Sequence, residues 1–265
     1  MNEIVIHNWD EFEEKVKGVY LEVIKLRNDN PSHVSDPLFR GHSDKGWELK
    51  STLDRIKEKT HINEYCKIIR VIKSSVESCT SNIWPLQSLD KEIEGIDQNI
   101  PLPSMEDYQF MTYLRHNGFP SPLLDWTSSP YIAAFFAFNE AKDQDVAIFM
   151  YIEYTGQAKS WICGDARICS MGPNVTTHKR HHLQQSRYTF CLKEDNHSQK
   201  YYTNHEDAFA FEYKDQDLLR KYVIPVSQKS DFMGKLHQMN INAYSLFETE
   251  EGLMNKLSNE QFILK

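Results

Sequence analysis

Apolar residues recur every three or four positions over much of the chain, as expected for helices that bury one face. Asn8 together with Glu11 resembles a capping box at the start of the first such stretch. The pattern predicts helices at Trp9–Arg27, Trp47–Lys59, Ile62–Ser78, Ser104–Gly118, Lys229–Met239 and Leu253–Leu257.

Shorter apolar runs rich in β-branched and aromatic residues indicate strands. The strongest is Val146–Tyr154, whose only charge is Glu153, and we place it in the middle of the sheet. Further strands are predicted at Pro37–His42, at Leu123–Trp126, around Tyr188 and at Tyr244–Phe247, while Leu218–Val226 is either a strand or the end of a helix. Helical insertions of unequal length separate these strands. This favours an α+β fold with a central, largely antiparallel sheet and N-terminal helices over a regular parallel sheet.

The stretch Ser121–Lys142 combines a strand, helix-capping hydroxyls and an almost wholly apolar helix. Pro130 suits the first turn of that helix, because a backbone N–H is not needed there. Asp125 is unusual, because a carboxylate in an apolar strand is costly to bury without a partner, whereas the nearby helix N-terminus favours anions. The stretch is therefore either the wall of a ligand site or a packed core in which Asp125 caps a turn and Trp126 fills space.

Composition limits the class of protein. The chain has 265 residues, of which 40% are hydrophobic, and we expect a single domain over residues 1–265. The formal net charge of −8 argues against a general coat for nucleic acid or membranes, which bind chiefly through Lys and Arg. The five cysteines form no C-x-x-C pair, and neither a secretory segment nor an apolar run of about 18 residues is found. These features predict a reduced, cytoplasmic protein that does not enter a membrane.

Positive charge gathers ahead of the strand at Tyr188. The residues are His178, Lys179, Arg180, His181, His182 and Arg187. We expect no metal site, because no cysteine or carboxylate stands at finger spacing from these histidines. The cluster is either a groove for nucleic acid or a solvated turn. A second candidate surface is the irregular segment Thr80–Pro103, a lid or partner-binding loop in which we expect Trp84 and Leu86 to be exposed.

Several motifs follow one another in the order used by one bacterial family. They are Phe39-Arg40-Gly41, His116-Asn-Gly118, Leu123-Leu-Asp-Trp-Thr127 with an Ala-x-x-Phe helix, Arg180-x-x-x-Gln184-Gln185, Ile224-Pro225, and Lys235-Leu236 to Ser245-Leu-Phe247. With these motifs the chain resembles the bacterial FRG domain over about residues 35–260, which leaves residues 1–34 as an N-terminal helical extension. The chain departs from the family at Arg115, usually Gln, at Ser121-Pro122, usually Thr-Arg, and at Ser186, usually Gly.

The resemblance implies a fold similar to that of ADP-ribosyltransferases, with NAD as the bound cofactor. The implied cofactor-binding residues are Arg40, Gly41, Trp126, Thr127 and Ser128, and the implied catalytic residues are Gln184, Asp125, His116 and Arg180. In this scheme Arg40 holds the pyrophosphate and Trp126 stacks on a ring. Thr127 and Gln184 bond ribose, while Asp125 orients His116 or Arg180.

Gln184 stands where these enzymes use a glutamate, and an amide cannot act as a base. Either another glutamate assists catalysis, with Glu153, Glu206 and Glu212 as candidates, or the nucleophile needs little activation. We therefore expect an NAD-dependent ADP-ribosyltransferase that uses no metal.

The resemblance also implies a biological role, that of a bacterial toxin or anti-phage effector held silent by an antitoxin protein. The basic cluster beside Gln184 favours nucleic acid as the acceptor, RNA before DNA. The alternatives are a transferase that acts on protein and a catalytically inactive module that binds a nucleotide or a partner.

Overall fold

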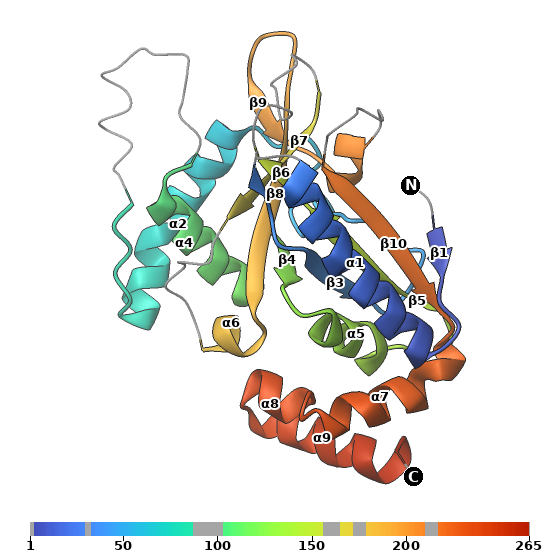
Figure 1. The fold of residues 1–265 in the computed structure, drawn as a ribbon. Helices are drawn as coiled ribbons and strands as arrows, with labels where there is room; N and C mark the ends of the chain where they lie inside the picture. The colour runs from blue at the N-terminus through green and yellow to red at the C-terminus, as the bar shows by residue number, and fades with distance from the viewer. Residues whose placement is uncertain are drawn as a thin grey trace.

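The computed structural model describes residues 3–29, 33–86, 103–155, 165–171, 179–209 and 217–264. These residues form a mixed α/β fold in which helices pack on an open, mostly antiparallel sheet (Figure 1). Its strands are β1 (Glu3–Val5), β3 (Leu38–His42), β4 (Leu124–Thr127), β5 (Val146–Ile152), β7 (Arg167–Met171), β8 (Ser186–Glu194), β9 (Lys200–Tyr202) and β10 (Leu218–Ile224). A separate small sheet pairs β2 (His33–Val34) with β6 (Tyr154–Thr155).

The strands of the main sheet follow the order β1-β10-β5-β3-β4-β8-β7, and β9 also pairs with β8. β1 and β10 are parallel, whereas every other pair along this order is antiparallel. The strands predicted from Phe39, Leu123, Val146 and Tyr188 lie side by side as β3, β4, β5 and β8, which confirms the predicted fold class. β5 is buried along its whole length, and Leu218–Ile224 is a strand.

Eight α-helices occur in the described residues. They are α1 (Trp9–Asp29), α2 (Ile62–Thr80), α4 (Met105–His116), α5 (Pro130–Asn139), α6 (Arg180–Leu183), α7 (Lys229–Gln238), α8 (Ala243–Phe247) and α9 (Glu250–Phe262). α4 begins with the capping box formed by Ser104 and Asp107, and Ser129 caps α5 directly before Pro130. Across the part of the chain that the structure describes, no helix has the length and apolar content that crossing a membrane would require.

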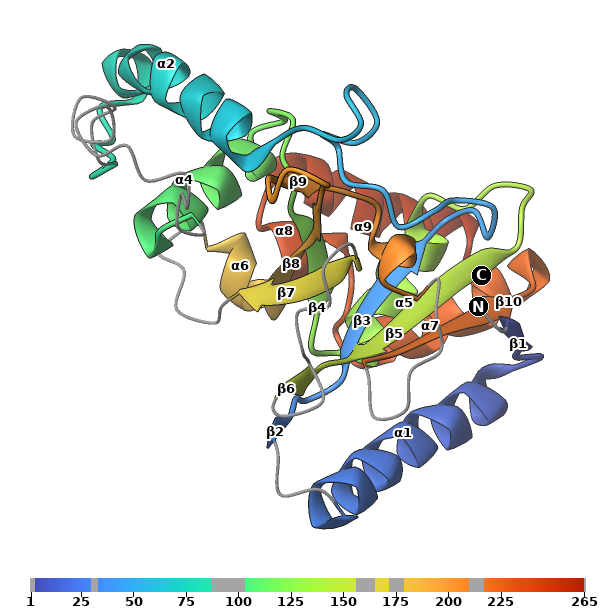
Figure 2. The same cartoon turned by 90° about the horizontal axis from the view of Figure 1, so that it is seen from above.

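Successive residues of each central strand point to opposite faces of the sheet, and each face has its own core. The first, which we call the loop-covered face, carries Leu38, Leu124, Trp126, Ala147, Phe149, Tyr151 and Cys191, packed with Leu49, Ala208 and Phe209. On the other, the helix-covered face, α1, α5 and α7 lie over β3, β5 and β10, while α2 and α4 lie over β8. The two helix groups lie far apart in the view of Figure 2.

Gly41 explains why α5 can lie so close to the sheet. A Cβ at this position would meet Ala133 O at 2.0 Å and Ala137 N at 2.6 Å, both backbone atoms of α5. Only a glycine therefore allows this contact. The close approach at Gly41 is that of a helix, and the implied role of Gly41 in holding a cofactor is not needed to explain it.

The N-terminal segment is part of the main core rather than an appended extension. β1 adds a parallel strand to the sheet edge at β10. α1 buries Trp9, Phe12 and Val16 against Phe232 and other residues of the core that α5 shares. Removing residues 1–34 would therefore expose apolar surface on the rest of the chain.

Two predicted elements are wrong. Residues 47–59 form turns instead of a helix. The amides of Arg55 and Lys57 make single helical bonds to Ser51 O and Leu53 O, while the amide of Leu53 donates outside the segment, to Ser121 O. Residues 244–247 lie in α8 instead of a strand, because the side chains of Asn242 and Ser245 form a capping box at its start.

The expected exposure of Trp84 and Leu86 is also wrong. Both are half-buried against the core under α4, and the Trp84 ring lies 5.2 Å from that of Phe110 and 4.9 Å from that of Tyr113. The Trp84 amide donates to Glu77. Residues 87–102 of the predicted docking segment lie outside the described residues.

Candidate functional site

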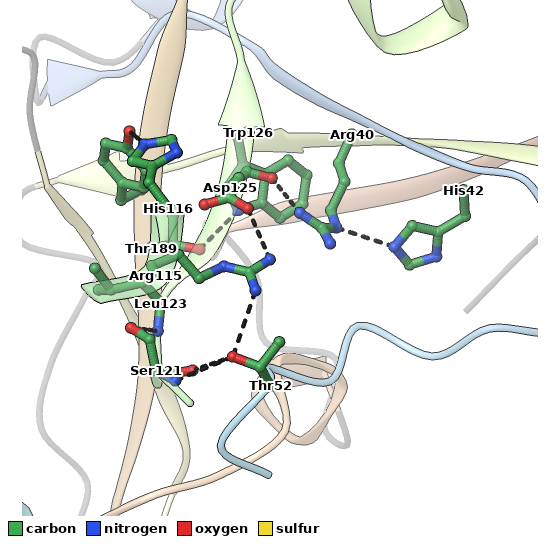
Figure 3. Close-up of polar contacts among 11 residues, drawn as sticks. Arg40, His42, Thr52, Arg115, His116, Ser121, Leu123, Asp125, Trp126 and Thr189 are labelled. Carbon is green, nitrogen blue, oxygen red and sulfur yellow. Dashed lines mark hydrogen bonds and ion pairs between the residues drawn. The ribbon is translucent and has the colours of Figure 1, made fainter. Parts of the chain in front are cut away.

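The sheet opens between β3 and β4, and Arg40 fills the opening. The two strands pair through Phe39 and Thr127. The Ser128 amide donates to Gln185 O, on the side of β8. Because successive residues of a strand direct their backbone N–H and C=O groups to alternate sides, the backbone groups of Asp125 face β3. There the Asp125 carbonyl accepts a 2.5 Å hydrogen bond from Arg40 Nη1, in place of a ladder bond (Figure 3).

The side chains of Asp125 and Arg40 leave the sheet on opposite faces. Leu124 and Trp126, the neighbours of Asp125, belong to the loop-covered core, so Asp125 itself points to the helix-covered face. Phe39 and Gly41, the neighbours of Arg40, face the helices, so Arg40 points to the loop-covered face. Their charged groups nevertheless come together, because the guanidinium reaches the opening. The Asp125 carboxylate turns toward α4, where Oδ2 accepts a 2.7 Å bond from Arg115 Nη2.

Arg115 is fixed at both ends of its guanidinium. Its Nη1 donates to Thr52 Oγ1, which in turn accepts from the backbone amide of Ser121, just before β4 (Figure 3). The Arg115 side chain is 17% exposed and that of Asp125 is 37% exposed, so the pair is in contact with solvent.

The neighbouring charges influence the protonation of Asp125 and of Arg40. Burial raises the pKa of Asp125, but the positive charges of Arg115 and Arg40 outweigh it and hold the pKa below its usual value. Burial lowers the pKa of Arg40 to about 10, against the opposing effect of Asp125. At neutral pH all three are charged, and two cations beside one anion leave one positive charge in excess.

His42 positions the other side of Arg40. Arg40 Nε donates 2.9 Å to His42 Nε2, which must therefore carry no proton. Burial, and after it the charge of Arg40, lowers the pKa of His42 to about 3. The ring is neutral at physiological pH, so it can hold Arg40 without repelling it.

His116, the residue after Arg115, contacts the residue opposite Asp125. Asp125 and Tyr188 are register partners of β4 and β8, and His116 Nε2 lies 2.7 Å from the Tyr188 hydroxyl. The same hydroxyl lies 3.2 Å from Nδ1 of His181 on α6. His116 is thus next to Asp125, and it also helps to lower the pKa of Asp125.

Trp126 is not placed to stack on a ligand. It is 3% exposed, its ring packs 5.7 Å from that of Tyr151, and Nε1 donates 2.7 Å to Thr189 Oγ1. Thr189 Oγ1 also lies 2.8 Å from His205 Nε2. The prediction of ring stacking by Trp126 is wrong, since the indole lies in the loop-covered core.

Thr127 and Ser128 serve the turn into α5. Thr127 is 4% exposed, and its hydroxyl accepts from the amide of Ser129. Ser128 is half-buried and donates 3.2 Å to Gln185 Oε1. Of the two, Ser128 lies nearer to solvent, so it is the better candidate for a ligand contact.

Arg180 and Gln184 are directed to the C-terminal helices instead of Asp125. The Arg180 guanidinium lies 5.7 Å from the centre of the Phe247 ring, and Gln184 Nε2 donates 3.1 Å to Leu246 O. Both contacts are with α8. The predicted orientation of Arg180 by Asp125 is therefore wrong, because Arg115 occupies that carboxylate.

Two of the glutamate candidates are described. The backbone amide of Glu153 donates to Ser35 Oγ, and the Glu206 carboxylate accepts from the amide of Leu49. Glu212 and His178 lie outside the described residues. Gln185, the residue before Ser186, takes the left-handed conformation with φ of 49°.

The basic cluster does not form one surface. Lys179, directly before α6, and His182 on α6 are exposed, whereas His181 is 3% exposed. The Arg187 side chain leaves β8 on the face opposite to that of Tyr188, and it donates to Ser186 O. No group of three histidine, cysteine or carboxylate side chains gathers in metal-binding fashion within the described ranges.

Sequence reasoning missed Arg115, Thr52 and Tyr188 as members of the site. Arg115 was visible only as a departure from the family pattern. The available signal was its place: it stands in the last turn of the helix directly before the strand of an Asp that needs a partner. Tyr188 gave no signal, because a tyrosine in a strand is ordinary core.

Comparison with known proteins gives one match. The FRG domain matches residues 35–146, a span that runs from just before β3 through α4, β4 and α5 to the first residue of β5. No curated protein and no solved structure matches the chain. The matched span contains Arg40, Arg115, His116 and Asp125, and over it the chain carries an FRG domain.

Proposed function

We propose that the protein is an NAD-dependent ADP-ribosyltransferase whose donor site is centred on Arg40, Arg115 and Asp125. The observation that carries the proposal is the excess positive charge at these three groups. The protein as a whole carries a formal charge of −8, so a partly buried centre with excess positive charge is unlike the protein's average. Such a centre suits the pyrophosphate of a dinucleotide.

Two buried atoms support a ligand at this place. Within the described residues, Arg115 Nε and Asp125 Oδ1 have no hydrogen-bond partner. A buried polar atom without a partner costs about 1–3 kcal/mol, which a bound ligand with both donors and acceptors would recover. A donor on an arginine and an acceptor on a carboxylate fit a phosphate oxygen and a ribose hydroxyl respectively.

The residues of the chain divide the work as follows. Arg40 and Arg115 would hold phosphate, Ser128 would contact a ribose, and Asp125 would keep both guanidinium groups in place. NAD, when bound, supplies the ADP-ribosyl group and the nicotinamide that leaves. His116 would act at the acceptor side, next to Asp125. The same proposal includes that the central sheet is of the ADP-ribosyltransferase type.

We further propose nucleic acid as the acceptor, RNA before DNA. Exposed Lys179, directly before α6, supports this choice, because it places a positive charge near the His181–Tyr188 contact. The proposed role is that of a cytoplasmic bacterial toxin or anti-phage effector held silent by an antitoxin protein. Growth arrest on expression, relieved by a co-expressed neighbour gene product, tests that role.

A catalytically inactive nucleotide-binding module is the second candidate. The contact of Gln184 with Leu246 favours it, since the residue at the glutamate position is tied to α8 by its side chain. Both candidates predict binding of NAD, but only the enzyme releases nicotinamide.

The test uses adenylate-labelled NAD with RNA, DNA and protein from a bacterial lysate. We expect nicotinamide release and label in the RNA fraction that ribonuclease removes. Label that survives ribonuclease but not protease would mean a protein acceptor. NAD binding without nicotinamide release or label would establish the inactive module and refute the transferase.

A matched pair of variants assigns the activity to this site. Arg40→Gln should lower kcat/KM about 10- to 100-fold, from the loss of about 1.5–3 kcal/mol of charge-assisted bonding. Arg27→Gln is the control, because Arg27, like Arg40, donates to a backbone carbonyl, that of Val34, and it lies outside the site, where it pairs with Asp36. Equal losses in both variants would contradict the assignment.

A further inference from the structure

The Tyr188 hydroxyl lies between two imidazole rings that come from different helices. His116 of α4 approaches it with Nε2 at 2.7 Å, and His181 of α6 with Nδ1 at 3.2 Å. The His181 ring stacks on the Tyr188 ring with an interplanar angle of 17°, and the His116 ring stands edge-on at 86°. Tyr188 itself is 0% exposed, so the described contacts of its hydroxyl lie in a water-poor environment.

Counting protons shows how the three groups are coupled. A neutral tyrosine hydroxyl has one proton to donate and can accept from another donor. The Ser186 side chain also bonds the Tyr188 side chain. With both rings neutral, a ring nitrogen that accepts the hydroxyl proton carries none of its own, and the other ring nitrogen can bond the hydroxyl oxygen only by donating a proton. When the hydroxyl donates to either ring, the two rings therefore have opposite protonation at the nitrogens that face it.

We propose that Tyr188 is a proton relay that makes His116 and His181 one titrating unit at the donor site. This inference rests on the proposed transferase function. A proton taken up by the His116 ring leaves through Nε2 to the Tyr188 oxygen, and the Tyr188 proton passes to His181 Nδ1. No other bond is made or broken, and the positive charge moves from His116 to His181.

The relay gives His116 the capacity that Gln184 lacks. A general base must hand on the proton it accepts before the next turnover. The hydroxyl stays protonated, because burial first and the Asp125 carboxylate second raise the pKa of Tyr188. The other charged or titratable groups around the unit are Asp125 from β4, Arg115 from α4, and His182, whose ring lies 5.3 Å from that of His181.

The test follows the histidine rings directly, so it does not depend on turnover. Long-range ¹H–¹⁵N spectra of the full chain, labelled at histidine, report the tautomer and titration of His116 and His181, with assignments from His116→Gln and His181→Gln. In the unmodified protein we expect opposite protonation at the two nitrogens that face Tyr188. We also expect two coupled titration steps about one pH unit or more apart.

Tyr188→Phe should uncouple the rings, so that the two histidines titrate independently and lose their matched tautomers. Tyr151→Phe is the control, since it removes an equally buried hydroxyl that bonds Asp217 at 2.6 Å. Unchanged histidine spectra in Tyr188→Phe would overturn the relay, whatever the activity. If nicotinamide is released, the acid limb of its pH profile should shift in Tyr188→Phe alone.

Discussion

Gly41 offers the sharpest test of how β3 and α5 fit together. The change Gly41→Ala places a methyl group 2.0 Å from Ala133 O and 2.6 Å from Ala137 N. Both atoms belong to the helix backbone, so no side chain can rotate away, and α5 must shift from β3. Overpacking typically costs about 1–3 kcal/mol, and a clash with backbone belongs at or above the upper end. We expect a loss of about 3 kcal/mol, or about 6–12 °C in Tm for a chain of this size.

The matched control is Gly18→Ala in the middle of α1, where an added Cβ has no atom within 4 Å. There the substitution should stabilise the protein by about 0.5–1 kcal/mol, because alanine loses less backbone freedom in a helix. Urea and thermal unfolding followed by circular dichroism measure both variants. Wild-type stability of Gly41→Ala would refute the close packing of α5 on β3, and would reopen a ligand role for Gly41.

The remaining predictions concern protonation and the ion pair. His42 and His205 both have a pKa of about 3, chiefly through burial, so between pH 6.5 and 3 the unfolded chain binds protons that the folded chain does not. The free energy of unfolding should therefore fall as pH drops from 6.5, by about 2 kcal/mol per histidine at pH 5, and urea titrations that show no such fall would contradict this. A double-mutant cycle with Arg115→Met and Asp125→Asn should give a coupling energy of about 1 kcal/mol, reduced by solvent exposure, and a value of zero would mean that the pair does not form in solution.

The sequence predicted the sheet well because its strands carry the signal locally. β5 is a run of apolar and aromatic residues, and all seven are buried. α5 is likewise indicated by the capping residue Ser129, by Pro130 and by an apolar run. Each of these elements is determined by residues within it, so their identity did not depend on knowing their neighbours.

Predictions failed where one or two hydrogen bonds decided the local structure. Residues 47–59 have helical spacing of apolar positions, yet they form turns, and the Leu53 amide donates to Ser121 O outside the segment. Residues 244–247 are apolar enough for a strand, but Asn242 and Ser245 cap a short helix. In both cases one or two hydrogen bonds outweighed a weak pattern of apolar positions. Helix and strand propensities do not take such bonds into account.

The geometry of the site could not be predicted from the sequence, because it depends on how α4 packs. α4 buries Tyr108, Met111 and Leu114 against the core that Tyr188 and Phe190 share. This contact sets the rotation of its last turn, so that the consecutive residues Arg115 and His116 meet Asp125 and Tyr188.

Those two partners are themselves opposite one another on β4 and β8. A rotation of α4 by one residue, about 100°, would exchange or remove both contacts. Asp125 would then be a carboxylate without its closest cation, and His116 would lose the hydroxyl that fixes its tautomer. The packing of the buried face of α4 thus determines both which cation pairs with Asp125 and which hydroxyl contacts His116. The apolar residues of that face make neither contact themselves.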